Sequence, residues 1–448
     1  MLLRRIARQV ILTLTICLCL ITSATAGAAS LADEWEETSN LYLFSAVCRA
    51  AYTDQRADML LELLRDEGWV IETYFQEGDK ADAKFFMASR PSNDGRPPLL
   101  LLAVAGTESK KDVKVDLTLD KTPFINVFSD EPNDQPINGV DGQALVHKGF
   151  LRYVKTALTA RPLDQPSLVE ELQAHPEQKI YLVGHSLGGA VATLGGATLL
   201  TLGVPPEQVE VVTFGAPPVG NQAFVDAFNS RLHLTRIVTN GDPVAGFLLD
   251  MVGGYRQFGR EVKYAVPKNE DKSPHSMAIY GDVIMKRYFD VKKAAEQAGV
   301  IQNENVKTTD NQPIIYLAPV TGHLPASLQD EFPYMQSVAL ELSTQHLPGY
   351  VVEKEPLPTL SLSVALQRAA AAGADAILMT DVQVERMQKE KSMYYVTATL
   401  SVYRVSDGVL VSYSTMGSNT NELTVLQAFS RGVADELLLS SDWLGKLK

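Results

Sequence analysis

Apolar segments without a polar face alternate with helix-like segments over the first two-thirds of the chain. The runs 99–105 and 180–183 are wholly apolar, which is typical of parallel strands covered on both faces. Further strands are expected at 69–75, 85–89, 209–214 and 235–239, and helices at 40–51, 59–64, 167–174 and 223–228. Strands that alternate with helices predict an α/β fold with a mostly parallel sheet.

The pattern restarts after a polar stretch at 294–311. Strands are expected at 314–317, 350–352, 376–380, 393–405 and 409–415, and helices at 328–342, 362–372 and 423–438. Ser406-Asp407-Gly408 predicts a hairpin turn between the last two strands. We therefore expect a first domain over 27–293, a linker over 294–311 and a second, smaller α+β domain over 312–448.

Residues 1–26 have the layout of a secretory signal peptide. Arg4, Arg5 and Arg8 precede the apolar run 10–21, and small residues at 24–26 fit cleavage before Gly27. A single membrane anchor is the alternative, for which this run is short. Export would take the protein to the periplasm or outside the cell, and cleavage would leave Cys48 as the only cysteine, with no partner for an intramolecular disulfide.

Composition narrows the class of protein. The 448 residues are 46% hydrophobic and carry a net charge of −13, and no basic stripe is present, so nucleic acid is not expected as a partner. No residues have the spacing of metal ligands, and neither a metal nor a cofactor is expected.

A G-x-S-x-G motif at 184–188 lies between the strand 180–183 and a helix expected over 190–202. A serine at such a sharp turn is lifted clear of the sheet, and Gly184 and Gly188 remove side chains that would collide there. Ser186 is therefore the candidate nucleophile. Its helix begins with free N–H groups that favour an oxyanion, and the N–H of Leu187 is one candidate donor.

A serine nucleophile needs a base, and the base needs a carboxylate. Asp242 follows the strand 235–239, where an acid would project from the edge of the sheet; an ordinary Asp-Pro turn is the alternative. His275, His323 and His346 follow it in the chain, and only His275 lies within the first domain. The second oxyanion donor should come from a neighbouring strand end, and Thr107 follows such a strand.

Six segments together resemble the class 3 lipases, an α/β-hydrolase family that includes the fungal triacylglycerol lipases. They are VAGTES at 104–109, VHKGF at 146–150, GHSLGGA at 184–190, FGAPPVGN at 214–221, RIVTNGDPV at 236–244 and PHSMAIY at 274–280. The resemblance covers about residues 40–290. It implies Ser186 as nucleophile, Asp242 as orienting acid, His275 as base, and Thr107 with Leu187 as oxyanion donors.

The resemblance also implies a lipid or other acyl ester substrate and a lid after the oxyanion strand. The loop 108–146 could supply a lid, and Phe124, Ile125, Val127 and Phe128 are its only obvious apolar group. The second domain is more faintly similar to small envelope domains of TolB N-terminal type, which suggests an envelope protein partner. A non-catalytic scaffold that uses a hydrolase fold is therefore the alternative to a secreted serine ester hydrolase.

Overall fold

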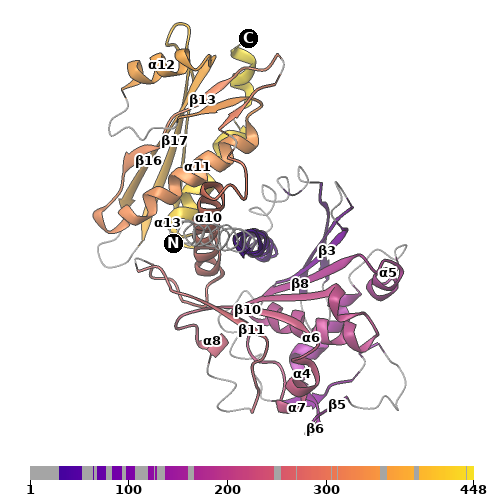
Figure 1. Cartoon of the computed structure of the whole chain (residues 1–448). Helices are drawn as coiled ribbons and strands as arrows, with labels where there is room; N and C mark the ends of the chain where they lie inside the picture. The colour runs from indigo at the N-terminus through magenta and orange to yellow at the C-terminus, as the bar shows by residue number, and fades with distance from the viewer. Residues whose placement is uncertain are drawn as a thin grey trace, which may run out of the picture. The chain divides into compact units, whose positions relative to one another are not determined.

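A seven-stranded sheet forms the centre of the first of two units into which the internal contacts divide the chain (Figure 1). The first unit comprises Asn40–Pro267 and Lys272–Ile284, and the second comprises Met1–Ser39, Lys268–Asp271 and Met285–Lys448. The structure is a computed structural model that describes residues 30–52, 64, 68–76, 83–92, 97–105, 120–125, 127–128, 137–159, 166–246, 254–268, 270–303, 305–309, 311–353, 361–387, 393–439 and 441–447.

The strands of the first sheet follow the order β1 (Val70–Gln76), β2 (Ala83–Arg90), β3 (Leu99–Val104), β8 (Lys179–His185), β9 (Val209–Phe214), β10 (His233–Thr239) and β11 (Arg260–Tyr264). All neighbours from β3 to β11 are parallel, whereas β1, β2 and β3 pair antiparallel. The sheet is thus mostly parallel, as predicted. Only β11 was not expected, because its sequence REVKY mixes charges into an edge strand that is partly exposed.

Helices cover both faces of this sheet. Helices α4 (Lys148–Leu158), α5 (Leu168–Ala174), α6 (Leu187–Thr201) and α7 (Gln222–Phe228) pack on one face, and residues from the helix at 30–50 and from α10 (Met277–Gln297) pack on the other. The run of β3 is wholly apolar because its side chains are buried on both faces of the sheet. Leu100 and Leu102 pack in the core that contains α6, and Leu101 and Ala103 pack in the core that contains α10. The predicted α/β-hydrolase architecture is confirmed for this unit.

Several predictions fall on residues outside the described ones. These are the signal peptide at 1–26, nearly all of the helix at 59–64, Thr107, and most of the loop 108–146. The described part of the loop contains β4 (Lys121–Pro123), β5 (Asn138–Gly139), β6 (Gly142–Gln143) and β7 (Leu145–His147).

One expectation about that loop is wrong. Phe124 was grouped with residues that could belong to a lid, but it is fully buried and meets Phe224 and Phe228 edge to face. Val127 and Phe128 also pack against the core, so of this group only Ile125 is exposed. An apolar side chain that is packed in the core is not available to contact a lipid interface.

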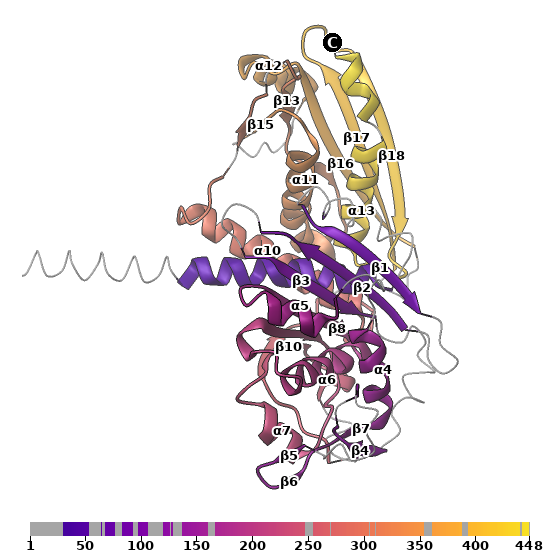
Figure 2. The ribbon, with the colours of Figure 1, turned by 90° about the vertical axis from the view of Figure 1, so that its right-hand side faces the viewer.

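The second unit contains a second sheet, in the order β12 (Val306–Lys307), β15 (Tyr350–Val352), β13 (Ile315–Leu317), β16 (Ala376–Arg386), β17 (Tyr394–Arg404) and β18 (Leu410–Asn419), with β14 (Thr321–His323) paired to β16. Figure 2 shows α13 (Val425–Leu439) along β17 and β18, with α11 (Phe332–His346) beside it. From Tyr394 to Val402, buried residues of β17 alternate with residues that are half-buried or exposed, which matches this one-sided cover. Helix α12 (Leu362–Ala371) packs with Tyr316 and Ile377 in a separate cluster. The predicted smaller α+β part is present.

Helix α10 passes through the expected domain boundary at 293/294. It continues to Gln297, and the division by contacts falls earlier, between Ile284 and Met285. Beyond that division the helix still buries Tyr288, Phe289 and Val291. Composition marks where the chain becomes polar, whereas contacts mark where a helix changes its packing partners. The domain limits from the sequence remain a prediction.

Candidate active site

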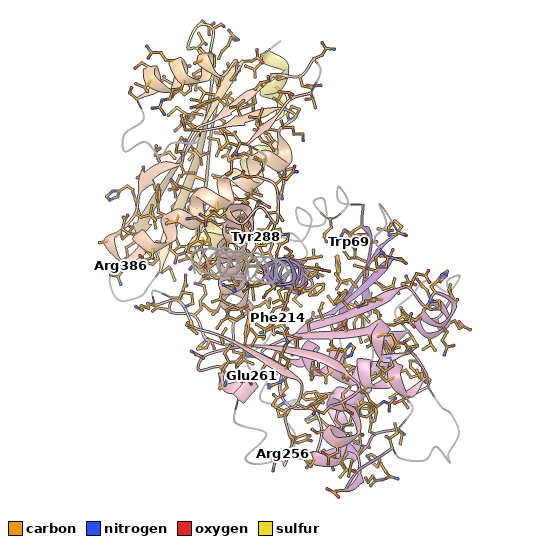
Figure 3. The ribbon with its side chains drawn as sticks, viewed as in Figure 1. Trp69, Phe214, Arg256, Glu261, Tyr288 and Arg386 are labelled. Carbon is orange, nitrogen blue, oxygen red and sulfur yellow. The ribbon has the colours of Figure 1, made fainter. Side chains whose placement is uncertain are left out.

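Ser186 occupies the turn between β8 and α6 in a conformation that few residues adopt. Its φ is 57° and its ψ is −124°, and its backbone N–H donates to the carbonyl of Phe214 at 3.0 Å (Phe214 is labelled in Figure 3). A non-glycine residue held in this region costs about 1–3 kcal/mol. The fold maintains that strain through hydrogen bonds and packing on both sides of the turn.

Two glycines make this turn possible. A Cβ on Gly184 would come within 2.3 Å of the carbonyl carbon of Gly188, and a Cβ on Gly188 would come within 2.1 Å of the carbonyl oxygen of Val104. Both distances are far shorter than any van der Waals contact. The motif therefore needs glycine at both positions because the first turn of α6 lies directly against β8 and the end of β3.

The sequence-predicted serine, histidine and carboxylate meet in the structure. His275 Nε2 is 2.9 Å from Ser186 Oγ, and His275 Nδ1 is 2.9 Å from Asp242 Oδ2 and 3.0 Å from Oδ1. Asp242 follows β10, and His275 precedes α10. Since the carboxylate can only accept, Nδ1 carries the proton, which leaves the lone pair of Nε2 facing the hydroxyl.

Asp242 is held as an anion by its surroundings. Burial alone raises its pKa, but the hydrogen bond and charge of His275 and the hydrogen bonds from Tyr280 and the Val244 N–H bring the pKa below its ordinary value. The Tyr280 hydroxyl donates to Oδ2 at 2.6 Å, and the N–H of Val244 donates to Oδ1 at 2.8 Å. A carboxylate with this many donors keeps one orientation and so orients the imidazole.

Two contributors to the site were not recognised as such in the sequence. Tyr280 also accepts a hydrogen bond from the Thr239 N–H at 3.2 Å, and burial followed by the charge of Asp242 raises its pKa, so the phenol keeps its proton. Gly215 follows β9 at φ 60°, and a Cβ there would come within 2.6 Å of Asp242 Oδ2. Both residues lie in segments that carry the family resemblance, PHSMAIY and FGAPPVGN, so the sequence contained a signal for them. Their roles depend on contacts with residues distant in the sequence, which the segments alone do not reveal.

The oxyanion donors are described only in part. Leu187 is the first residue of α6, where a backbone N–H has no acceptor within the helix. Thr107 lies outside the described residues. The described chain before it ends with β3, whose last residue is Val104, and with Ala105. The contact that a Cβ on Gly188 would make with Val104 shows that this strand end adjoins the first turn of α6. The assignment of Thr107 and Leu187 stays a prediction.

The other candidate histidines differ in their settings. His323 is exposed in β14, and His346 lies at the end of α11 with Nδ1 near the Leu342 carbonyl; both belong to the second unit. Within the described ranges, no three acidic, histidine or cysteine side chains are grouped so that they could hold a metal ion. In the same ranges, no helix has the length and apolar character needed to cross a membrane.

Comparisons with known proteins give the following matches. Residues 101–250 match the family model described as lipase (class 3). Lipase A of Sodiomyces alcalophilus is 32% identical over 179 residues, which are 36% of this chain and 42% of that protein. Toxin TseL of Vibrio cholerae is 29% identical over 37% of this chain and 25% of the toxin. Secreted mono- and diacylglycerol lipase 2 of Gibberella zeae is 36% identical over 29% of this chain and 32% of that lipase.

The alignments span less than half the length of each of these relatives. Among solved structures, the lipase from Rhizopus microsporus var. chinensis is similar over 53% of this chain and 77% of that chain, with 22% identity and a TM-score of 0.40. The triacylglyceride lipase of Rhizomucor miehei is similar over 52% of this chain and 82% of that chain, with 21% identity and the same TM-score.

Proposed function

With the class 3 lipase match of residues 101–250 as the premise, we propose that this protein is a serine hydrolase that cleaves lipid or other acyl esters. The observation that carries the proposal is the chain of contacts from Ser186 Oγ through His275 to Asp242, with 2.9 Å at each step. This geometry fits acyl transfer, since a hydroxyl becomes an effective nucleophile only when a base takes its proton.

The reaction would proceed in two halves. Ser186 Oγ attacks the ester carbonyl while its proton moves to His275 Nε2, and Asp242 stabilises the imidazolium that forms. The N–H groups of Leu187 and Thr107 would hold the oxyanion. The imidazolium then gives its proton to the departing alcohol. In the second half, His275 takes a proton from water and the resulting hydroxide attacks the acyl-enzyme. The imidazolium then returns its proton to Ser186 Oγ as the bond to the acyl group breaks, and the free acid leaves.

The names of the relatives support the proposed substrate class. Their names include lipases, a mono- and diacylglycerol lipase and phospholipase A1-II 1 of Oryza sativa subsp. indica, which is 28% identical over 32% of this chain. A lipase, a phospholipase and a carboxylesterase all fit the same triad. Hydrolysis of a panel of glycerides, phospholipids and short esters of graded acyl length would separate these three.

Substitution of the serine tests the central claim. Ser186→Ala should lower turnover of a fluorogenic acyl ester by about 10⁴-fold or more, because the nucleophile is gone, and should abolish labelling by a fluorophosphonate probe. Ser363→Ala, at an exposed serine of α12, is the matched control and should keep both activities. An unlabelled wild-type protein would instead favour the non-catalytic scaffold.

Export is part of the proposal. The layout of residues 1–26 supports a signal peptide, and relatives named as secreted support export of the hydrolase. N-terminal sequencing of the protein recovered outside the cytoplasm should begin at Gly27. A mature chain that begins at Met1 and stays with the membrane would show that the segment is an anchor.

A further inference from the structure

His185, the residue before the nucleophile, contacts the segment that carries the base. Its side chain is buried, with 6% of the residue exposed. Nε2 lies 2.8 Å from the backbone carbonyl oxygen of His275, and Nδ1 lies 2.8 Å from the hydroxyl of Tyr52. Both ring nitrogens of His185 therefore have polar partners.

The partners fix the proton positions on the ring. A carbonyl oxygen can only accept, so His185 Nε2 must carry hydrogen and donate to His275. Burial, and then the charge of His275, lower the pKa of His185 to about 3, so its ring is neutral at ordinary pH. In the neutral ring Nδ1 has a lone pair, and it accepts from the Tyr52 hydroxyl.

We propose that His185 is a positioning residue: it holds the backbone of His275 so that the imidazole reaches Ser186, and Tyr52 fixes the tautomer that makes this possible. The inference rests on the function proposed above. His185 and Ser186 are adjacent in the chain, so the nucleophile and the support of the base are placed by the same strand end.

The segment before α10 depends on such side-chain support. Its residues belong to no sheet, and the carbonyls of two consecutive residues are held by side chains from two strands. Thr239 Oγ1 in β10 donates to the carbonyl of Pro274, and His185 at the end of β8 donates to that of His275. Without the bond from His185 the carbonyl of His275 would lose this support, and the ring could move away from Ser186.

Neutrality suits His185 to this position. Its ring centroid is 4.8 Å from that of His275, where a positive charge would oppose the imidazolium formed during acyl transfer. Among the described residues, the groups that face it are His275 and Asp242, which act through their charges, and the rings of Tyr52 and Tyr280, each 5.8 Å away. A lysine or a charged histidine could donate the same hydrogen bond but would weaken the base.

Two substitutions at one position separate the hydrogen bond from packing. His185→Phe keeps an aromatic ring but cannot donate, whereas the amide nitrogen of Gln in His185→Gln can reach the place of Nε2 and donate to His275. We expect His185→Phe to lower kcat by about 10²-fold with little change in KM, since a misplacement of about 1 Å costs that much. We expect His185→Gln to recover most of the loss.

Tyr52→Phe completes the set, because it removes only the hydroxyl that fixes the tautomer. It should lower kcat by about threefold to tenfold and leave the melting temperature near that of the wild type. The proposal is overturned if folded His185→Phe has wild-type kcat, or if His185→Gln is as impaired as His185→Phe while both fold. If His185→Phe does not fold, Tyr52→Phe decides, and an unchanged kcat overturns the proposal.

One measurement does not depend on turnover. Nitrogen-15 NMR of the wild-type imidazoles at pH 5 should show His185 neutral, with hydrogen on Nε2; hydrogen on Nδ1, or a charged ring, would overturn the proposal. If the wild type hydrolyses no ester but His185 has the expected tautomer, the proposed function is wrong. The inference that His185 holds the backbone of His275 is then still supported.

Discussion

Gly215→Ala is a change of one methyl group that should disable the site. Gly215 has φ 60°, and a Cβ there would lie 2.6 Å from Asp242 Oδ2, 2.9 Å from the Tyr280 hydroxyl and 3.1 Å from His275 Nδ1. All three atoms belong to the hydrogen-bonded group that orients the base. The added methyl group therefore presses on the contacts that the proposed mechanism needs.

The expected size of the effect follows from these distances. A carbon and an oxygen approach comfortably to about 3.3 Å, so the carboxylate or the backbone must move by roughly 0.7 Å. A displacement approaching 1 Å at a reacting group costs about 10²-fold in rate. Alanine at positive φ adds about 1–2 kcal/mol of backbone strain. We expect kcat to fall by about 100-fold and stability by about 2 kcal/mol or more.

Gly203→Ala is the matched control. Gly203 also has positive φ, 88°, but the nearest atom to its Cβ would be Gln173 Nε2 at 3.7 Å. It follows α6 at the end remote from Ser186. This variant should carry the backbone strain without the crowding, so its unfolding free energy should fall while its kcat stays near that of the wild type.

Steady-state hydrolysis of a soluble fluorogenic ester, together with urea unfolding, measures both quantities. Only Gly215→Ala should lose kcat, whereas both variants should lose stability. A folded Gly215→Ala protein with kcat within threefold of the wild type would refute it, because the crowded atoms would then not be the ones that orient the base.

Other variants test the remaining contacts. Asp242→Asn should lower kcat by about 10³–10⁴-fold, since an amide can stabilise the wrong imidazole tautomer, and stopped assays with excess enzyme would detect the residual rate. His275→Ala should abolish ester turnover while His323→Ala leaves it unchanged; the reverse result would mean that the base is misassigned. Tyr280→Phe removes a donor to Asp242 and leaves the Thr239 N–H without its acceptor, so it should raise the pKa of Asp242 and cost about 1–3 kcal/mol in urea unfolding. Because the pKa of His185 falls from 6.5 to about 3 on folding, the unfolded chain binds a proton between these values that the native chain does not. The His185 side chain should therefore cost almost no stability above about pH 6.5 and roughly 3 kcal/mol at pH 4.5. In urea unfolding, His185→Gln should lack this part of the loss of stability as the pH falls.

The sequence alone determined the local elements and the order of the chemistry. Wholly apolar runs such as 99–105 must be covered on both faces, so periodicity predicted the parallel sheet. The glycines around Ser186 define a turn by local sterics, and an acid after one strand followed by a histidine before a helix gave the chain order of the proposed triad. Each of these inferences concerns residues and their near neighbours in the chain.

Only the tertiary structure decided the contacts between distant segments. Tyr52 and His185 are 133 residues apart and Asp242 and Tyr280 are 38 apart, and no periodicity links such pairs. Phe124 was assigned to a lid-like group because an apolar residue in a loop has no visible partner until Phe224 and Phe228 are placed against it. Gly215 gives the same lesson, because its missing Cβ matters only once the order of the strands has brought β9 beside β10. The pattern of apolar and polar residues along the chain indicates which side chains are buried. The packing of the sheet and its helices determines which other residues those side chains contact.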